Sequence, residues 1–179
     1  MQKAKKYLDL ALEKGAIHAV AVTPDEIVFD GRTLLKCMFG CEDWGKGCTC
    51  PSREGFLKPW EFEPLLRKYS AVLIIHANDK KTTQNAAFAV EEQAFWDGDA
   101  LAFSMSDCAL CENCAGKTGQ GCRNPRAARP AFHSVGIDVF ATVKRLGLPI
   151  ETLKNPQEEL QNWYSAVWLN LWGEKAAWR

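Results

Sequence analysis

Eight cysteines, gathered into two groups of four, constrain the fold of this 179-residue chain more than any other feature. One group lies between positions 37 and 50, and the other lies between positions 108 and 122. The first group lies in a stretch rich in glycine and proline, with few other apolar residues to form a core around it. Something other than a regular helix or strand must order such a stretch. We therefore expect two cysteine-rich, metal-binding loops, at 37–59 and 107–130, on a folded body.

The compartment decides what a cysteine is used for, and the N-terminal segment bears on it. This segment has several lysines but no uninterrupted apolar run and no small-residue cleavage site, so it does not read as a secretory signal. No stretch approaches the roughly 18 apolar residues that a membrane span needs. We therefore expect a cytoplasmic protein without a membrane partner. In the cytoplasm, cysteines are metal ligands or redox groups more often than disulfide frameworks.

The second group is the more specific, with the spacing Cys108-x2-Cys111-x2-Cys114-x7-Cys122 followed by Arg-Asn-Pro. A short loop of this kind can turn three thiolates onto one compact iron-sulfur cubane, while a more distant cysteine takes the fourth corner. Bacterial ferredoxins use the same C-x2-C-x2-C core with a fourth cysteine next to a proline. A structural zinc site prefers two separated ligand pairs, which would crowd out the middle cysteine. This ferredoxin-like motif favours a 4Fe-4S cluster over zinc or free thiols.

The first group has the looser spacing Cys37-x3-Cys41-x6-Cys48-x-Cys50 and ends in a Cys-Pro pair. A second 4Fe-4S cluster, a zinc ion, and a cluster that takes one ligand from the other loop all stay open here. Cys48 and Cys50 are so close that one of them could be a spare. The number of available thiolates favours a second iron-sulfur cluster.

The rest of the chain predicts an α/β fold, a small mixed sheet flanked by helices in a single domain over residues 1–179. Loops held by such a scaffold are where binding sites are usually found. The apolar patterning predicts strands at 16–22, 71–77, 101–105 and 161–171, a further extended segment at 27–35, and helices at 1–15, 60–69, 83–98 and 134–146.

Charge is balanced over the chain, with 22 basic and 22 acidic residues, but it is uneven around the second loop. Arg123, Arg126 and Arg129 follow the last cysteine without an acidic residue among them. These arginines could lie near an anionic cluster and raise its reduction potential, or they could form a solvated face or pair with acids. No interleaved aromatic residues accompany them, so a nucleic-acid partner is not expected.

The histidines have different surroundings in the sequence. His18 and His76 lie in apolar strands, where a hydrogen-bonded core imidazole is more common than a metal ligand. His133 precedes a helix near the second loop, and the roles of proton donor, ligand, helix cap and exposed side chain all stay open for it.

The C-terminus is rich in tryptophan, which suits a core, a homodimer contact or a stacking surface for a flat cofactor. These residues are Trp163, Trp168, Trp172 and Trp178. The chain contains no dinucleotide-binding glycine fingerprint, phosphate-binding loop or nucleophile elbow, so a self-bound NAD and nucleotide hydrolysis lack support. The spacing after Cys37 also departs from the C-x3-C-x2-C of radical-SAM enzymes.

Several blocks together resemble a known family, the predicted metal-binding proteins called domain of unknown function 2284. The blocks are Cys-Ala-Leu-Cys-Glu-Asn-Cys at 108–114, Cys-Arg-Asn-Pro at 122–125, Ala-Arg-Pro at 128–130, Gly-Ile-Asp-Val at 136–139, and the Cys-Pro pair at 50–51 after Gly45-Lys46. The resemblance implies a prokaryotic cytosolic metalloprotein with iron-sulfur clusters. The chain departs from the family pattern at Ser52, where a second proline is usual, and at His133, where glutamate is usual.

These observations predict an electron carrier or redox subunit with one or two 4Fe-4S clusters, which exchanges electrons with a redox protein partner or a reductase. One alternative is a zinc-stabilised interaction or regulatory module. Another is a small iron-sulfur reductase, whose substrate would lie between the clusters and the aromatic C-terminus.

Overall fold

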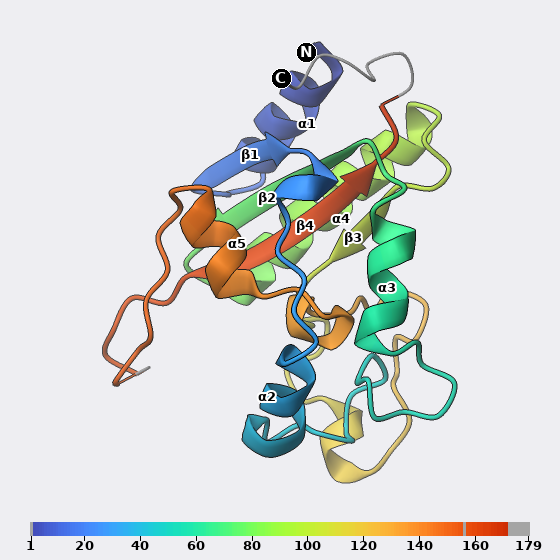
Figure 1. Cartoon of the computed structure of the whole chain (residues 1–179), viewed down its shortest axis with the longest axis vertical. Coiled ribbons are helices and arrows are strands. Elements are labelled where there is room, and N and C mark those ends of the chain that lie inside the picture. The colour runs from blue at the N-terminus through green and yellow to red at the C-terminus, as the bar shows by residue number, and fades with distance from the viewer. Residues whose placement is uncertain (1, 156, 172–179) are drawn as a thin grey trace.

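The computed structural model describes residues 2–155 and 157–171 and confirms the α/β class (Figure 1). Within these residues, a single sheet has the strand order β1-β2-β4-β3, and every neighbouring pair is antiparallel. The strands are β1 (His18–Val22), β2 (Ala71–Ala77), β3 (Phe103–Met105) and β4 (Trp163–Leu169).

The mixed sheet expected from the sequence differs from this arrangement in one respect. β2 and β3 run in the same direction, because each of them is antiparallel to β4. The helix α4 (Lys80–Trp96) connects β2 to β3 and leaves a gap of one strand between them. β4 comes from the C-terminal part of the chain and fills that gap, so no parallel pair forms in the described sheet.

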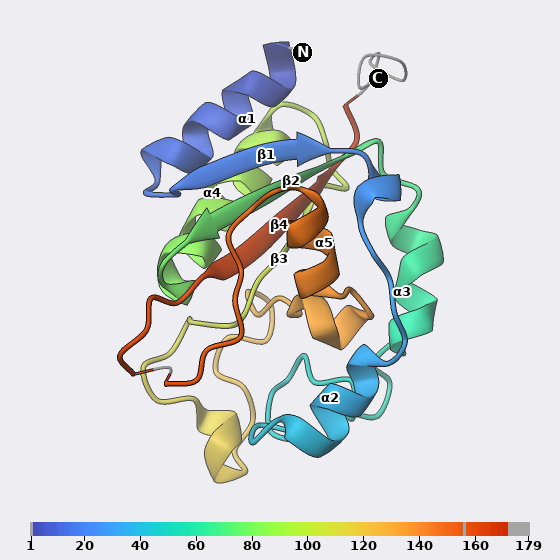
Figure 2. The ribbon, with the colours of Figure 1, turned by 60° about the vertical axis from the view of Figure 1, so that its left-hand side comes forward.

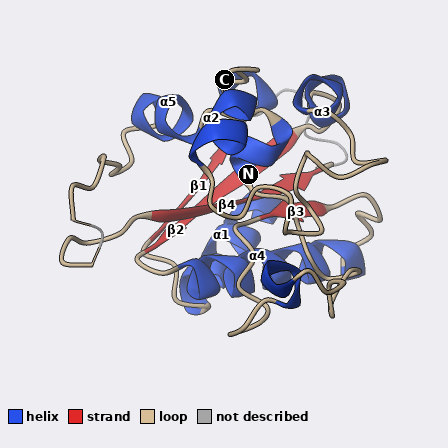
Figure 3. Ribbon diagram, turned by 90° about the horizontal axis from the view of Figure 1, so that it is seen from below, coloured by secondary structure: helices blue, strands red, loops and turns tan. Residues whose placement is uncertain are grey.

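Helices cover both faces of the sheet, as Figure 3 shows. α1 (Gln2–Glu13) and α4 lie on one face, whereas α3 (Pro59–Leu66) and α5 (Val139–Arg145) lie on the other. The predicted helix at 134–146 is divided into a 3-10 turn, η3 (Phe132–Val135), and α5. Gly136, with a φ of 87°, ends the turn, and the carboxylate of Asp138 then caps α5 by accepting a hydrogen bond from the Ala141 amide at 2.9 Å.

The side chains of β2 are buried on both faces of the sheet and therefore belong to two cores. Leu73 and Ile75 pack with α1 and α4, whereas Val72 and Ile74 pack on the opposite face with Trp168 of β4. Burying one such aliphatic side chain contributes about 1.5–3 kcal/mol. Burial on both faces explains why six of the seven residues at 71–77 are apolar.

The segment at 27–35 is not extended throughout, and the sequence-based prediction is wrong for its second half. Phe29 forms one β-bridge with Ile137, after which the chain turns and the helix α2 (Thr33–Gly40) begins. Leucine, lysine and methionine in this stretch favour a helix. Cys37 therefore lies on a helix rather than in an irregular loop.

The histidine and tryptophan predictions have mixed outcomes. His76 is buried and hydrogen-bonded to Asn162, as expected for a core imidazole, but its cross-strand neighbour His18 is exposed. Trp168 is fully buried in the core. Trp172 and Trp178, to which the homodimer prediction also referred, lie outside the described residues.

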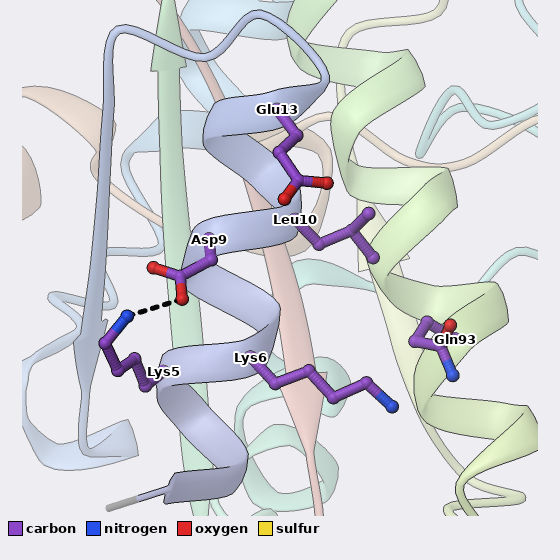
Figure 4. A pocket seen from close by; sticks show the side chains of 6 residues that line it. All are labelled: Lys5, Lys6, Asp9, Leu10, Glu13 and Gln93. Carbon is purple, nitrogen blue, oxygen red and sulfur yellow. Dashed lines mark hydrogen bonds and ion pairs between the residues drawn. The ribbon is translucent and has the colours of Figure 1, made fainter.

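A surface groove of about 450 Å³ runs between α1 and α4 (Figure 4). Lys5 pairs with Asp9 at 2.5 Å, as Figure 4 shows. Lys6 extends to Asp97 at 2.7 Å. The Tyr7 hydroxyl donates to the same Asp97 carboxylate at 2.9 Å. The lysine charges of this groove are thus paired within the protein, and the contacts join α1 to the end of α4.

No helix of the described residues is long and apolar enough to cross a membrane.

Candidate metal centre

The two ends of the second cysteine loop are held together directly below the sheet. After β3, the Ser106 amide donates to the carbonyl of Pro130 at 3.1 Å. The buried side chain of Gln84, on α4, donates to the Ser106 hydroxyl at 3.1 Å and accepts from the Ala109 amide at 3.0 Å. These bonds satisfy a buried amide and fix the start of the loop at residues 106–109.

The first loop is attached to the chain that follows the second loop. The Asp30 amide donates to the carbonyl of Gly136 at 2.8 Å, next to the bridge between Phe29 and Ile137. A Cβ atom at Gly136 would lie 3.1 Å from Pro59, where the first loop ends. The segment that leads into the first loop and the residue that ends it therefore both contact residues 136–137. These residues lie a few positions after Pro130, where the second loop ends.

This common attachment places the two loops side by side at one end of the molecule (Figures 1 and 2). Gly116, in the 3-10 turn η2 (Ala115–Thr118), packs directly on the backbone carbonyl of Lys46. An ion pair of 2.9 Å between Lys117 and Asp43 also joins the loops. The cysteines of both loops thus belong to one region of the structure.

One thiol of the first loop lies among thiols of the second loop. Cys48, from the first loop, hydrogen-bonds to Cys122 of the second loop and lies near Cys108. Burial first, and then these two neighbouring thiols, raise the pKa of Cys48 to about 11. The structure therefore brings Cys48 to the second loop, a possibility that the spacing had left open.

The other thiols of the first loop stay together. Cys37 interacts with Cys41 and Cys50 and with the carboxylate of Asp107, which immediately precedes the second loop's first cysteine. Burial, followed by these neighbours, raises the pKa of Cys37 to about 11. A bound metal cation would have to displace these protons to bind the thiolates.

Three N-H groups point at cysteine sulfur atoms. Asn124 donates from its side-chain amide to Cys111 Sγ at 3.1 Å and from its backbone to Cys122 Sγ at 3.4 Å. The Gly45 amide donates to Cys50 Sγ at 3.3 Å. Such donors stabilise thiolate ligands and tune the potential of an iron-sulfur cluster. The sequence showed Asn124 as part of the Cys-Arg-Asn-Pro motif but did not indicate this role.

All eight thiols are free, and none lies in the apolar cores. Cys41 and Cys108 are exposed, and the other six are half-buried. Among residues 2–155 and 157–171, no group of three or more histidine, cysteine or acidic side chains lies in a position to hold a single metal ion. As a donor set, eight thiols with N-H donors on three of them suit iron-sulfur ligation.

The three arginines of the second loop have different surroundings. Arg129 forms an ion pair with Glu91 of α4 at 3.0 Å and lies over the rings of Phe88 and Phe103. It thus fastens the end of the loop to the scaffold. Arg123 and Arg126 are exposed.

His133 is half-buried in η3, and no metal-ligand role follows from its position. Its imidazole interacts with the carboxylate of Asp107 and lines two cavities beside the loops.

Comparison with known proteins adds one match. A family model described as a predicted metal-binding protein (DUF2284) matches residues 20–169, which include both cysteine loops and the whole sheet except the start of β1. No curated protein and no solved structure matches the chain.

Proposed function

Because the chain belongs to the DUF2284 family of predicted metal-binding proteins, we propose that its cysteine loops bind two 4Fe-4S clusters and that the protein is a cytoplasmic electron carrier. The observation that carries the proposal is the set of eight free thiols that the two loops bring into one region, together with the N-H donors of Asn124 on Cys111 and Cys122. When bound, each cluster supplies reversible transfer of one electron.

The ligands are divided between the clusters across the loops rather than loop by loop. Cys48 shares a site with Cys122, which it contacts, and with Cys108. Cys111 joins this set because Asn124 donates to both Cys111 and Cys122. The second set consists of the remaining cysteines. These are Cys37, Cys41, Cys50 and Cys114.

Cys114 is the one member of the second set that comes from the second loop. Its sulfur lies 3.6 Å from the Cβ position of Gly116, the residue that packs on Lys46 of the first loop. Cys114 is therefore at the junction of the loops. Bacterial ferredoxins likewise take the fourth ligand of a cluster from the other cysteine motif.

Several side chains are positioned to serve such a centre. Cys41 and Cys108 are exposed, one in each set, so a redox protein partner can approach both clusters. Arg123 and Arg126 follow Cys122 closely, and their charges favour the reduced, more anionic form of a cluster. Arg129 contributes by holding the loop on α4 through Glu91.

Metal analysis of anaerobically purified protein tests the cofactor. We expect a brown protein with iron and acid-labile sulfide in equal amounts, and Cys111→Ser should lose about half of both. Glu112→Gln changes the adjacent residue in the same loop, and it should keep the full amount. A colourless protein with stoichiometric zinc would overturn the proposal and support the zinc-stabilised interaction or regulatory module.

Reduction tests the electron-carrier role separately. Dithionite should bleach the visible absorption and produce the paramagnetic resonance signal of a reduced 4Fe-4S cluster, and an added oxidant should restore the starting spectrum. Clusters that bind but cannot be reduced reversibly would contradict a carrier. Oxidation of the reduced protein by a small organic molecule, with release of a reduced product, would instead indicate the reductase alternative.

A further inference from the structure

One cysteine sulfur of the first loop has two polar neighbours, and one of them is a side chain without a role in the proposed function. The Ser52 hydroxyl lies 3.0 Å from Cys50 Sγ, and the Gly45 amide donates to the same sulfur at 3.3 Å. A metal-bound thiolate has no proton and can only accept a hydrogen bond. Ser52 is therefore the donor whenever Cys50 is a metal ligand.

A tight turn of the backbone places Ser52 next to this sulfur. The Arg53 amide donates to the Cys50 carbonyl at 3.1 Å, which closes a four-residue turn over 50–53. Pro51 is the second residue of this turn, a position that suits the fixed φ of proline. The turn brings the side chain of its third residue, Ser52, back toward that of its first residue. A Cβ atom at Gly45 would lie 4.0 Å from Ser52 Oγ, so the two donors lie close together at the sulfur.

Asn124 is the corresponding side chain in the other proposed set of ligands. Its amide donates to Cys111 Sγ at 3.1 Å, whereas Ser52 serves Cys50. Backbone donors such as the Gly45 amide are present whatever side chain the residue carries. Ser52 and Asn124 are therefore positions at which a change of side chain can alter one set of ligands without altering the other.

A donor on a ligand sulfur acts on the reduction potential. An iron-sulfur cluster that gains one electron becomes more anionic, and part of the added charge lies on its sulfur ligands. A hydrogen bond to such a sulfur is therefore stronger in the reduced form than in the oxidised form, and it raises the potential. The step is the transfer of one electron from a reduced protein partner. It forms and breaks no covalent bond and moves no proton.

We propose that Ser52, acting through Cys50, raises the reduction potential of the cluster that this cysteine binds and leaves the potential of the other cluster unchanged. This inference rests on the proposed function, because it requires iron-sulfur clusters in the loops. It makes Ser52 a positioning residue for electron uptake, since its hydroxyl acts on the cluster only through the sulfur of Cys50.

Redox titration of the anaerobically purified protein, followed by electron paramagnetic resonance, tests this role. Threonine and valine have nearly the same shape, so Ser52→Thr and Ser52→Val differ only in the hydroxyl. The bulk of valine also keeps water from replacing the hydroxyl at this exposed position. Ser52→Val should lower one midpoint potential by about 59 mV, which corresponds to a tenfold change in the equilibrium constant of a one-electron reduction. Ser52→Thr should keep the wild-type value.

Two further variants serve as comparisons. Thr118→Val removes a hydroxyl of the second loop that donates to the Ala115 carbonyl at 2.9 Å rather than to sulfur, and it should leave both potentials unchanged. Asn124→Ala should lower the midpoint potential that Ser52→Val leaves unchanged. A shift of the same potential in both variants would overturn the separate action of Ser52 and place Cys50 and Cys111 on one cluster.

Other results would also overturn the inference. Equal potentials in Ser52→Val and Ser52→Thr would show that the hydroxyl has no effect. Loss of iron in Ser52→Val with full iron in Ser52→Thr would show that the hydroxyl retains the cluster rather than sets its potential. Metal analysis of the same preparations keeps the two proposals apart. A wild type without iron would refute the clusters and this role together, whereas full iron with unchanged potentials would refute the role of Ser52 alone.

Discussion

Gly116 packs against the backbone carbonyl of Lys46 so closely that a side chain at position 116 would overlap with it. The Cβ atom of an alanine there would also lie 3.2 Å from the Lys46 carbonyl carbon. Because the obstacle is backbone rather than a flexible side chain, one of the two loops would have to move. This contact is one of those that join the first and second cysteine loops.

Gly116→Ala should therefore separate the loops and reduce the bound metal. Overpacking of this kind typically destabilises by about 1–3 kcal/mol. The expected result is a lower melting temperature and a metal content below that of the wild type, measured on the same preparation. Gly121→Ala is the matched control, because nothing lies within 4 Å of its Cβ position. Equal behaviour of the two variants would show that the contact with Lys46 does not hold the loops together.

The contact between Cys48 and Cys122 predicts how paired cysteine substitutions combine. If both residues bind one cluster, Cys48→Ser and Cys122→Ser should each lose about half of the iron, and the double variant should lose no more. Cys37→Ser combined with Cys122→Ser should instead lose nearly all of it. Iron and sulfide analysis of the wild type and these four variants checks this. Additive loss in the Cys48/Cys122 pair would return the assignment to one cluster per loop.

The hydrogen bond from Tyr7 to Asp97, far from the cysteines, should contribute measurably to the free energy of unfolding. Its ring is buried, and its hydroxyl donates to Asp97, whose pKa is lowered mainly by Lys6. Burial and this carboxylate raise the pKa of Tyr7, so it remains a donor at all ordinary pH values. Tyr7→Phe should lower the free energy of unfolding by about 1.5–3 kcal/mol, the usual contribution of a hydrogen bond to a charged group.

Urea denaturation measures this effect, and the neighbouring lysine provides the comparison. Lys5 pairs with Asp9 on the exposed surface of α1, so Lys5→Gln should change the free energy of unfolding by less than about 1 kcal/mol. An effect of Tyr7→Phe as small as that of Lys5→Gln would mean that the Tyr7 bond does not fasten α1 to α4.

His76 predicts a pH dependence of stability. Burial lowers its pKa below the ordinary value, and the neighbouring His18 acts in the same direction, while the bond to Asn162 opposes both. The unfolded state therefore binds a proton more readily than the native state. Stability contributed by neutral His76 is fully present above the unfolded pKa of about 6.5, and it declines as the pH falls below that value.

The non-titrating variant His76→Gln isolates this contribution. Between pH 7 and pH 5, the free energy of unfolding of the wild type should fall more steeply than that of the variant, by at most about 1.4 kcal/mol per pH unit. Comparing the slopes removes the pH dependence of other groups, metal ligands included. Parallel slopes would show that His76 has the same pKa in the folded and unfolded states.

The local parts of this structure were readable from the sequence. The strands at 71–77 and 161–171 could be predicted because most of their residues are apolar or aromatic. This composition reflects the burial of both faces of each strand. α2 was missed because it has only eight residues, and its packing against η3 is a tertiary contact. Thr33, at the start of α2, is buried with its hydroxyl unpartnered among the described residues, and its sequence position does not distinguish it from an exposed threonine.

For the metal centre, the sequence by itself determined that there are two groups of four cysteines and that one has the spacing of an iron-sulfur ligand set. Only the tertiary structure decided that Cys48 meets Cys122 and that Asn124 donates to two sulfur atoms. The physical reason is that spacing along a chain limits distances only within one loop. How two loops face each other depends on the backbone bonds of residues 130–138, which join the segment before the first loop to both ends of the second loop.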